Sequence, residues 1–228
     1  MRRLRHPQRK KRLHEAMNAA WKAARAFQSD PGLKEAYDTL PRAPIKIVAC
    51  RMNKAANHGG LIRLAEAYRL ESLMFEAEED DTFDMSGVRG AQQWLDWQFG
   101  DVYTEVDEQK TAGRKIYGLT LCERAVPVQE IDWQFPATLI LGRELQGLPQ
   151  IMEEKCDECI AIPMYGLTTS LNVYSAAAIT IDRMVEAYRR AHPQFEPARN
   201  ASRKLLKIAD ADYSEFLSSD SDSEDSCD

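Results

Sequence analysis

The sequence predicts an α/β fold in which a mostly parallel sheet is flanked by helices. One stretch carries most of this prediction, because Ala137 to Tyr188 alternates short apolar runs with helical segments. Thr138 to Leu141 is an apolar run closed by Gly142, as expected of a buried strand, and Cys159 to Met164 is a second such run. The polar residues follow these runs directly, and open α/β sheets place their ligand sites at the carboxyl ends of strands.

The segments between the runs have a clear local pattern. A glycine turn that carries Glu144 follows the first run, and Leu148-Pro149 predicts a helix of about two turns, since Pro is tolerated in a first helical turn. The glycine spacing matches the start of a phosphate loop, but Leu148-Pro149 stands where Lys-Ser/Thr would be required. A loop rich in hydroxyl and amide groups, residues 165–172, precedes a long helix that begins at Val173.

Upstream, three further apolar runs predict strands at Ile45–Cys50, Glu71–Phe75 and Lys115–Leu121. Val88 to Trp97 has helical spacing, and we expect its tryptophans to pack against the body of the protein. Glu76 to Asp84 carries six acidic residues and reads as a solvated loop.

Two polar residues stand out in the helix expected after the first strand. Asn57 and Arg63 lie about one and a half turns apart near its start. The simplest interpretation of Asn57 is a helix N-cap, and that of Arg63 is a surface ion pair. Neither residue on its own favours a functional interpretation over these.

Composition limits the class of protein. The chain has 228 residues, enough for one sizeable α/β domain with extensions. No run approaches the roughly 20 apolar residues of a membrane span, and no apolar segment of a signal peptide follows the basic start. The five cysteines are an odd number, which favours reduced thiols in the cytoplasm. Cys156 and Cys159 have metal-like spacing, but no second pair exists, so we expect no metal site. His58, beside Asn57, could touch a substrate.

The net charge of −6 conceals a strong asymmetry. Residues 1–25 hold nine Lys and Arg against one acid, whereas residues 210–228 hold eight acids and no base. The basic segment is expected to be helical and to contact nucleic-acid phosphates; a solvated helix or an arm paired with the acidic tail are the alternatives. The acidic, serine-rich end predicts disorder. These features divide the chain into a basic extension at 1–43, a main domain at 44–190, and a C-terminal extension at 191–228.

Three segments together resemble the SPOUT superfamily of RNA methyltransferases, in its 2′-O-ribose, TrmH-type branch. They are Asn57–Arg63 with an Asn and an Arg six apart, Leu141–Leu148 with a Glu in its glycine turn, and Ile162–Met164 followed by Ser170–Val173. They occur in the family's order, and the resemblance covers roughly residues 44–190. Arg143 departs from the pattern, because relatives often have Asn before the Glu.

The resemblance implies a C-terminal trefoil knot, which general rules of chain topology would not predict. It also implies a homodimer, with the long helix and the first motif at the interface. S-adenosylmethionine would be the cofactor. The positions that would bind it are Leu119, Thr120, Gly142, Ile162, Met164 and Leu171.

The resemblance further implies five catalytic residues: Asn57, Arg63, Glu144, Ser170 and Asn172. Because a guanidinium stays protonated, we interpret Arg63 as an anchor for a phosphate or for the developing 2′-oxyanion, with Asn57 orienting it. Glu144 would fix its loop and hold substrate groups. Ser170 and Asn172 would position the active-site loop.

The expected substrate is tRNA, possibly at a D-loop guanosine, because no additional N-terminal RNA-binding domain of the kind seen in many rRNA-directed relatives is visible. Ribosomal RNA is the alternative within this class. A non-catalytic RNA-binding module of the same fold is the alternative outside it, disfavoured because all five catalytic residues are present.

Overall fold

The computed structural model describes residues 37–52, 54–77, 87–88, 90–143 and 146–195. Every element below lies within Leu40–Phe195, one of two units into which the chain divides. The predicted basic arm, the acidic tail and most of the acidic loop after Glu76 lie outside the described residues, so those expectations stay predictions.

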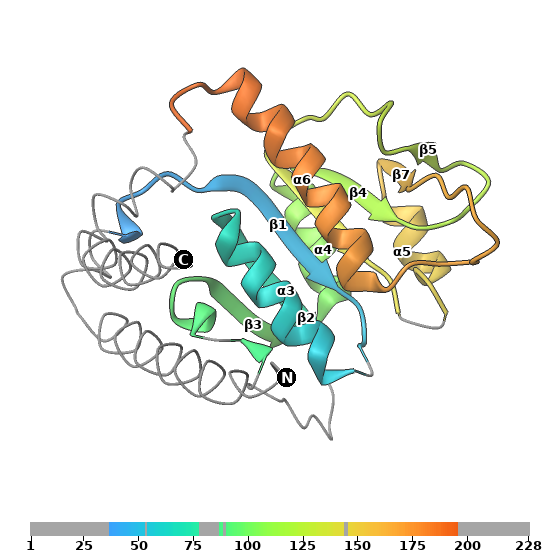
Figure 1. Cartoon of the computed structure of the whole chain (residues 1–228), viewed down its shortest axis with the longest axis horizontal. Coiled ribbons are helices and arrows are strands. Elements are labelled where there is room, and N and C mark those ends of the chain that lie inside the picture. Colours follow the sequence, from blue (N-terminus) through green and yellow to red (C-terminus); the bar gives the residue numbers. More distant parts are fainter. Residues whose placement is uncertain (1–36, 53, 78–86, 89, 144–145, 196–228) are drawn as a thin grey trace, which may run out of the picture. The chain divides into compact units, whose positions relative to one another are not determined.

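In the described part of the chain, seven strands form one sheet in the order β3-β2-β1-β6-β4-β7-β5. Every neighbouring pair is parallel, which confirms the predicted sheet (Figure 1). The strands are β1 Ala43–Ala49, β2 Leu70–Glu76, β3 Asp96–Gly100, β4 Lys115–Leu119, β5 Val126–Pro127, β6 Ala137–Leu141 and β7 Glu158–Ala161. Four of the five apolar runs predicted as strands thus become β1, β2, β4 and β6, with ends shifted by at most two residues.

Helices cover both faces of this sheet (Figure 1). They are α3 Ala55–Ala67, α4 Val102–Thr111, α5 Gln150–Lys155 and α6 Val173–Ala191, with a short 3₁₀ helix, η2, at Ala91–Gln93. One apolar cluster joins alternate residues of the central strands to α3 and α6, and a second joins the intervening residues to α4 and α5. Central strand β6 contributes to both and is buried at all five positions, which explains its continuous apolar run. None of the described helices combines the length and apolar character needed to cross a membrane.

Two predicted elements differ from the structure. Val88–Trp97 is not a helix: Gly90 has a left-handed φ of 87°, only η2 follows it, and β3 starts at Asp96. The tryptophans do pack against the body as expected, with Trp94 8% exposed and Trp97 edge-on to Phe75. The second apolar run is also shorter than predicted, since β7 ends at Ala161 and the next residues enter a loop.

The amino-terminal edge of the sheet is tied together by Arg114, whose side chain is 9% exposed. Its Nη1 donates to both carboxylate oxygens of Glu71, at 3.1 and 2.9 Å. Its Nη2 donates to the carbonyl oxygens of Pro44, at 3.1 Å, and Ala137, at 3.0 Å. One guanidinium therefore links the segment before β4 to β1, β2 and β6.

This linkage predicts that Arg114→Ala lowers the free energy of unfolding by about 2–4 kcal/mol, because two backbone carbonyls and a carboxylate lose their donor together. Glu71→Gln is the matched control. Glu71 is 42% exposed and both carbonyl contacts survive, so the cost should stay below about 1 kcal/mol. Urea unfolding of both variants measures the difference, and equal losses would contradict a role for the carbonyl contacts.

Candidate active site

Three neighbouring strands end at the same level at the carboxyl edge of the sheet. Leu119 of β4 is in register with Leu141 of β6 and with Ile160 of β7. The N–H of Thr120 donates to the carbonyl of Ile160 at 3.0 Å, so the pairing continues just past the end of β4. The three loops that follow therefore start side by side, which is the arrangement the polar loops in the sequence predicted.

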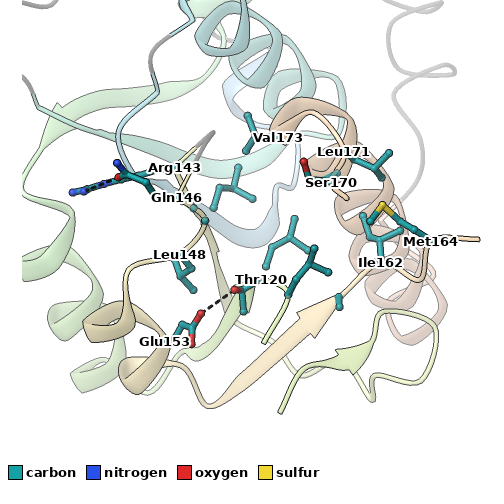
Figure 2. A pocket seen from close by; sticks show the side chains of 17 residues that line it. Thr120, Arg143, Gln146, Leu148, Glu153, Ile162, Met164, Ser170, Leu171 and Val173 are labelled. Atoms are coloured by element: carbon teal, nitrogen blue, oxygen red, sulfur yellow. Dashed lines mark hydrogen bonds between the residues drawn. The ribbon is translucent and has the colours of Figure 1, made fainter. Parts of the chain in front are cut away.

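A cavity of about 410 Å³ opens where these loops meet (Figure 2). Its size is typical of a site for a small molecule or cofactor. All six residues that the resemblance assigns to cofactor binding line it, as does Ser170. The other lining residues are Leu121, Leu141, Arg143, Gln146, Gly147, Leu148, Glu153, Ala161, Val173 and Ala176.

One wall of the cavity depends on a tight turn after β6. The N–H of Arg143 donates to the carbonyl of Gly147 at 2.8 Å, and the N–H of Gly147 donates back at 3.0 Å. Gly147 has a left-handed φ of 69°, which favours glycine. A Cβ on Gly142 would lie 2.4 Å from both the carbonyl carbon of Gly147 and the nitrogen of Leu148. The turn can fold back over the strand end only because position 142 has no side chain.

The cavity also contains an acidic side chain. Glu153, on α5, accepts a hydrogen bond at 2.9 Å from the hydroxyl of Thr120, which follows β4 (Figure 2). Neighbouring walls are apolar, including Leu119, Ile162 and Leu171. The cavity thus combines an apolar lining with one carboxylate held at a fixed place, a combination that suits an uncharged ring system carrying hydrogen-bond donors.

Asn57 and Asn172 are brought together from distant parts of the sequence. The Nδ2 of Asn172 donates to the Oδ1 of Asn57 at 3.1 Å. The Oδ1 of Asn172 caps α6, accepting from the N–H groups of Tyr174, at 2.9 Å, and Ser175, at 3.4 Å. Asn57 is 5% exposed in the first turn of α3, and the N-cap of that helix is Lys54, so the N-cap interpretation of Asn57 is wrong.

Arg63 lies on a different face of α3. It is six positions along the helix from buried Asn57, and its own side chain is exposed. Among the described residues it has no salt bridge and does not line the cavity, so the predicted ion pair is not seen. Glu144 lies outside the described residues, and its expected role stays a prediction.

His58, Cys156 and Cys159, which the sequence also raised as possible site residues, lie in the core. The His58 ring packs against Phe75, with centroids 4.8 Å apart, and is 8% exposed, so it belongs to the core; its contact with a substrate stays a prediction. Burial raises the pKa of the Cys156 thiol to about 12 and that of Cys159 to about 11, which keeps both protonated. The four cysteines within the described segments are all free. No three potential ligand side chains converge as a metal site in that part of the chain.

The sequence did not single out Glu153, Gln146 or the start of α6 as parts of the site. Glu153 stands one turn into α5, where its neighbour Glu154 is equally acidic, so only the fold distinguishes it. Val173 and Ala176 are three apart at the start of α6, and the run of small residues from Ser175 to Ala178 was the available signal.

A parallel, doubly covered sheet with a cofactor-sized cavity at the carboxyl ends of its strands is typical of α/β proteins that bind nucleotide-like ligands. Comparison with known proteins narrows this class. Residues 44–182 match the SpoU rRNA Methylase family, and the chain belongs to this family.

Curated relatives include enzymes for two kinds of RNA. The 23S rRNA (guanosine(2553)-2′-O)-methyltransferase RlmP of Bacillus subtilis is 34% identical over 128 residues, covering 55% of this chain and 51% of that protein. The tRNA (guanosine(18)-2′-O)-methyltransferase of Aquifex aeolicus is 29% identical over 138 residues, covering 59% and 65%. The chain therefore spans about half to two thirds of these relatives.

Solved structures match the fold. The Aquifex aeolicus TrmH/SpoU tRNA modifying enzyme superposes with a TM-score of 0.64 at 24% identity, covering 80% of this chain and 94% of that one. The AdoMet-bound rRNA methyltransferase of Sinorhizobium meliloti superposes with a TM-score of 0.57 at 25% identity, covering 69% and 60%. The knot expected from the resemblance is consistent with this family and stays a prediction for this chain.

The double role of Asn172 yields a stability prediction. Asn172→Ala removes the cap of α6 and the donor to Asn57, and should lower the free energy of unfolding by about 1–2 kcal/mol. Asn172→Asp keeps a capping oxygen but loses the donor to Asn57, so it should recover only part of that stability. Thermal unfolding compares the two. Indistinguishable variants would mean that the cap contributes nothing measurable.

Proposed function

We propose that this protein is an S-adenosylmethionine-dependent methyltransferase that methylates a ribose 2′-hydroxyl in RNA. One observation carries the proposal: in a member of the SpoU family, all six expected cofactor positions line one cavity at the carboxyl ends of β4, β6 and β7. Ser170 lines the same cavity, and Asn172, two residues on, fixes the start of α6.

The cavity suits S-adenosylmethionine in size and chemistry. Its volume of about 410 Å³ accommodates a molecule of that class, and Leu119, Ile162 and Leu171 offer an apolar surface to the adenine. The Glu153 carboxylate, oriented by the Thr120 hydroxyl, can accept from a hydroxyl or ammonium group of the cofactor. When bound, S-adenosylmethionine supplies a methyl group activated by a sulfonium.

The residues of the chain supply positioning and charge. In-line transfer needs the ribose oxygen aligned with the methyl group, so rigid placement accounts for much of the rate. The Asn57–Asn172 hydrogen bond fixes one end of the 162–172 loop against α3. Arg63, always protonated, would hold a phosphate or the developing 2′-oxyanion rather than remove a proton.

We propose that the active form is a homodimer, in which Arg63 acts on the cavity of the partner subunit. It lies on the exposed face of α3 and outside the cavity lining of its own chain. Of the seven large apolar side chains exposed in the described segments, five lie on the 165–171 loop or in the first half of α6: Tyr165, Leu167, Leu171, Tyr174 and Ile179. Such clustering is typical of a surface that a partner covers.

The proposed substrate is tRNA, supported by the Aquifex aeolicus relative. Ribosomal RNA is a second candidate, supported by the higher identity to the Bacillus subtilis enzyme. Methylation of unmodified tRNA and 23S rRNA transcripts with methyl-labelled cofactor separates them, because only the true substrate becomes labelled at a ribose.

Calorimetric titration with S-adenosylmethionine tests the cofactor site. The parent protein should bind it, and Gly142→Ala should weaken binding at least about 10-fold, because the new Cβ forces the 143–147 turn to move. Gly113→Ala is the matched control: it strains a residue with φ of 79° outside the cavity lining, so stability should fall while affinity stays unchanged. Absence of binding by the parent protein would refute the proposed function.

Mixing two inactive variants tests the role of Arg63. Arg63→Ala should abolish methyl transfer yet bind S-adenosylmethionine normally, and Gly142→Ala should lose transfer through the cofactor. If Arg63 acts on the partner's cavity, a refolded mixture contains dimers with one intact site, and part of the activity returns. A mixture that stays inactive would place Arg63 in its own chain's site, and an active Arg63→Ala protein would remove it from catalysis.

A further inference from the structure

Arg143 lies at the edge of the cavity, and its guanidinium is held by groups from three elements. Its Nη2 is 3.5 Å from Oε1 of Glu76, at the end of β2, and 3.5 Å from the hydroxyl of Tyr103, in the first turn of α4. Its Nη1 is 3.5 Å from Oε1 of Gln146. Figure 2 shows the Arg143 side chain directed away from Ile162 and Met164, on the far side of the cavity.

These contacts leave most of the binding capacity of the guanidinium unused. All three are at 3.5 Å, whereas charge-assisted hydrogen bonds are typically about 2.7–2.9 Å long. Arg114 in the same molecule makes four contacts of 2.9–3.1 Å and is 9% exposed, while the Arg143 side chain is 34% exposed. Both terminal nitrogens of Arg114 are satisfied by the protein, whereas those of Arg143 make only long contacts on a side chain that is partly exposed. The Nε of each arginine is buried and has no partner among the described residues.

A single carboxylate, that of Glu76, orients Arg143 through a long ion pair. The second carboxylate oxygen of Glu76 accepts from the N–H of Arg51 at 2.6 Å, which fixes the carboxylate to the loop after β1. Burial, reinforced by the charge of Glu76, raises the pKa of the neighbouring Cys50 thiol to about 12. The same two causes raise the pKa of Tyr103. Glu76 is therefore the only anion among the groups that the described residues place against Arg143.

We propose that Arg143 binds a backbone phosphate of the RNA beside the cofactor cavity, with Glu76 and Tyr103 as positioning residues. The proposal rests on the proposed RNA methyltransferase function. A ribose presented to the cavity carries phosphates on both sides, and a guanidinium fork matches the two oxygens of a phosphate. Its direction away from Ile162 and Met164 (Figure 2) favours a group of the RNA over one of the cofactor.

The test measures RNA affinity against salt for the full-length protein and its Arg143→Gln variant, with an unmodified tRNA transcript and a 23S rRNA transcript as probes. Loss of one phosphate contact should raise the Kd about 10-fold and reduce the slope of log K against log salt by about 1. Lys110→Gln is the matched control. It removes one charge near the far end of α4, where the side chain is 45% exposed, and should change neither quantity.

Two further measurements identify the anion. Arg143→Gln should bind S-adenosylmethionine as the parent protein does, and Glu76→Gln should weaken RNA binding less than loss of Arg143 itself. Weaker binding of S-adenosylmethionine but not of 5′-methylthioadenosine, which lacks the carboxylate, would assign Arg143 to the cofactor and overturn the proposal. An unchanged RNA affinity and salt slope would overturn it as well.

Failure of the Arg143 phosphate proposal can be distinguished from failure of the proposed methyltransferase function. If the parent protein binds RNA but never transfers a methyl group, the enzyme proposal fails while the effect of Arg143 on RNA binding is still measured. If transfer occurs and Arg143→Gln binds RNA normally, only the phosphate proposal fails. A parent protein that binds neither transcript overturns both.

Discussion

The close approach of the 143–147 turn to the end of β6 is the constraint on which the site depends. With only hydrogen at position 142, the backbone of Gly147 and Leu148 reaches within 2.4 Å of where a Cβ would stand. The turn closes on itself through two hydrogen bonds between Arg143 and Gly147. The chain then returns toward the sheet, where Leu148 is 5% exposed and α5 begins two residues later. Without this turn, α5 and its Glu153 would not face the end of β4.

A second constraint connects the two halves of the sequence. The Asn172 side chain both caps α6 and bonds to Asn57 in α3, so the residues before α6 are anchored to a helix more than a hundred positions earlier. Gly60 reinforces this junction, because a Cβ there would lie 2.9 Å from the ring of Tyr174. Two of the three segments that resemble the family are therefore coupled by direct contact within one chain.

The sequence predicted those parts of the fold in which burial alone decides the structure. β1, β2, β4 and β6 are covered on both faces, so their apolar runs were unambiguous. The helix α4 was missed because its buried face consists mainly of Val102 and Val106 within a polar segment. The Val88–Trp97 error has the opposite cause: apolar residues at helical spacing do pack inward there, but around Gly90, whose left-handed conformation interrupts any helix.

The residues of the site also fall into those that the sequence predicted and those that it did not. The six residues expected to bind the cofactor could be predicted from the resemblance, because the family motifs specify the backbone turns and the apolar positions that line the cavity. Glu153 could not be named, since nothing local separates it from Glu154 until α5 is placed against β4. Arg143 appeared in the sequence only as a departure from the family.

The cavity and its polar edge are held in place by different kinds of contact. The cavity is built from strand ends in register, a glycine turn and apolar side chains, and any change there disturbs packing on both sides of the sheet. The edge of the cavity carries polar side chains held by a few long contacts, as Arg143 is held at 3.5 Å by Glu76 and Tyr103. Substitutions at that edge cost little stability. Packing therefore fixes the proposed cofactor wall, whereas the proposed RNA-binding edge carries side chains that the core does not fix.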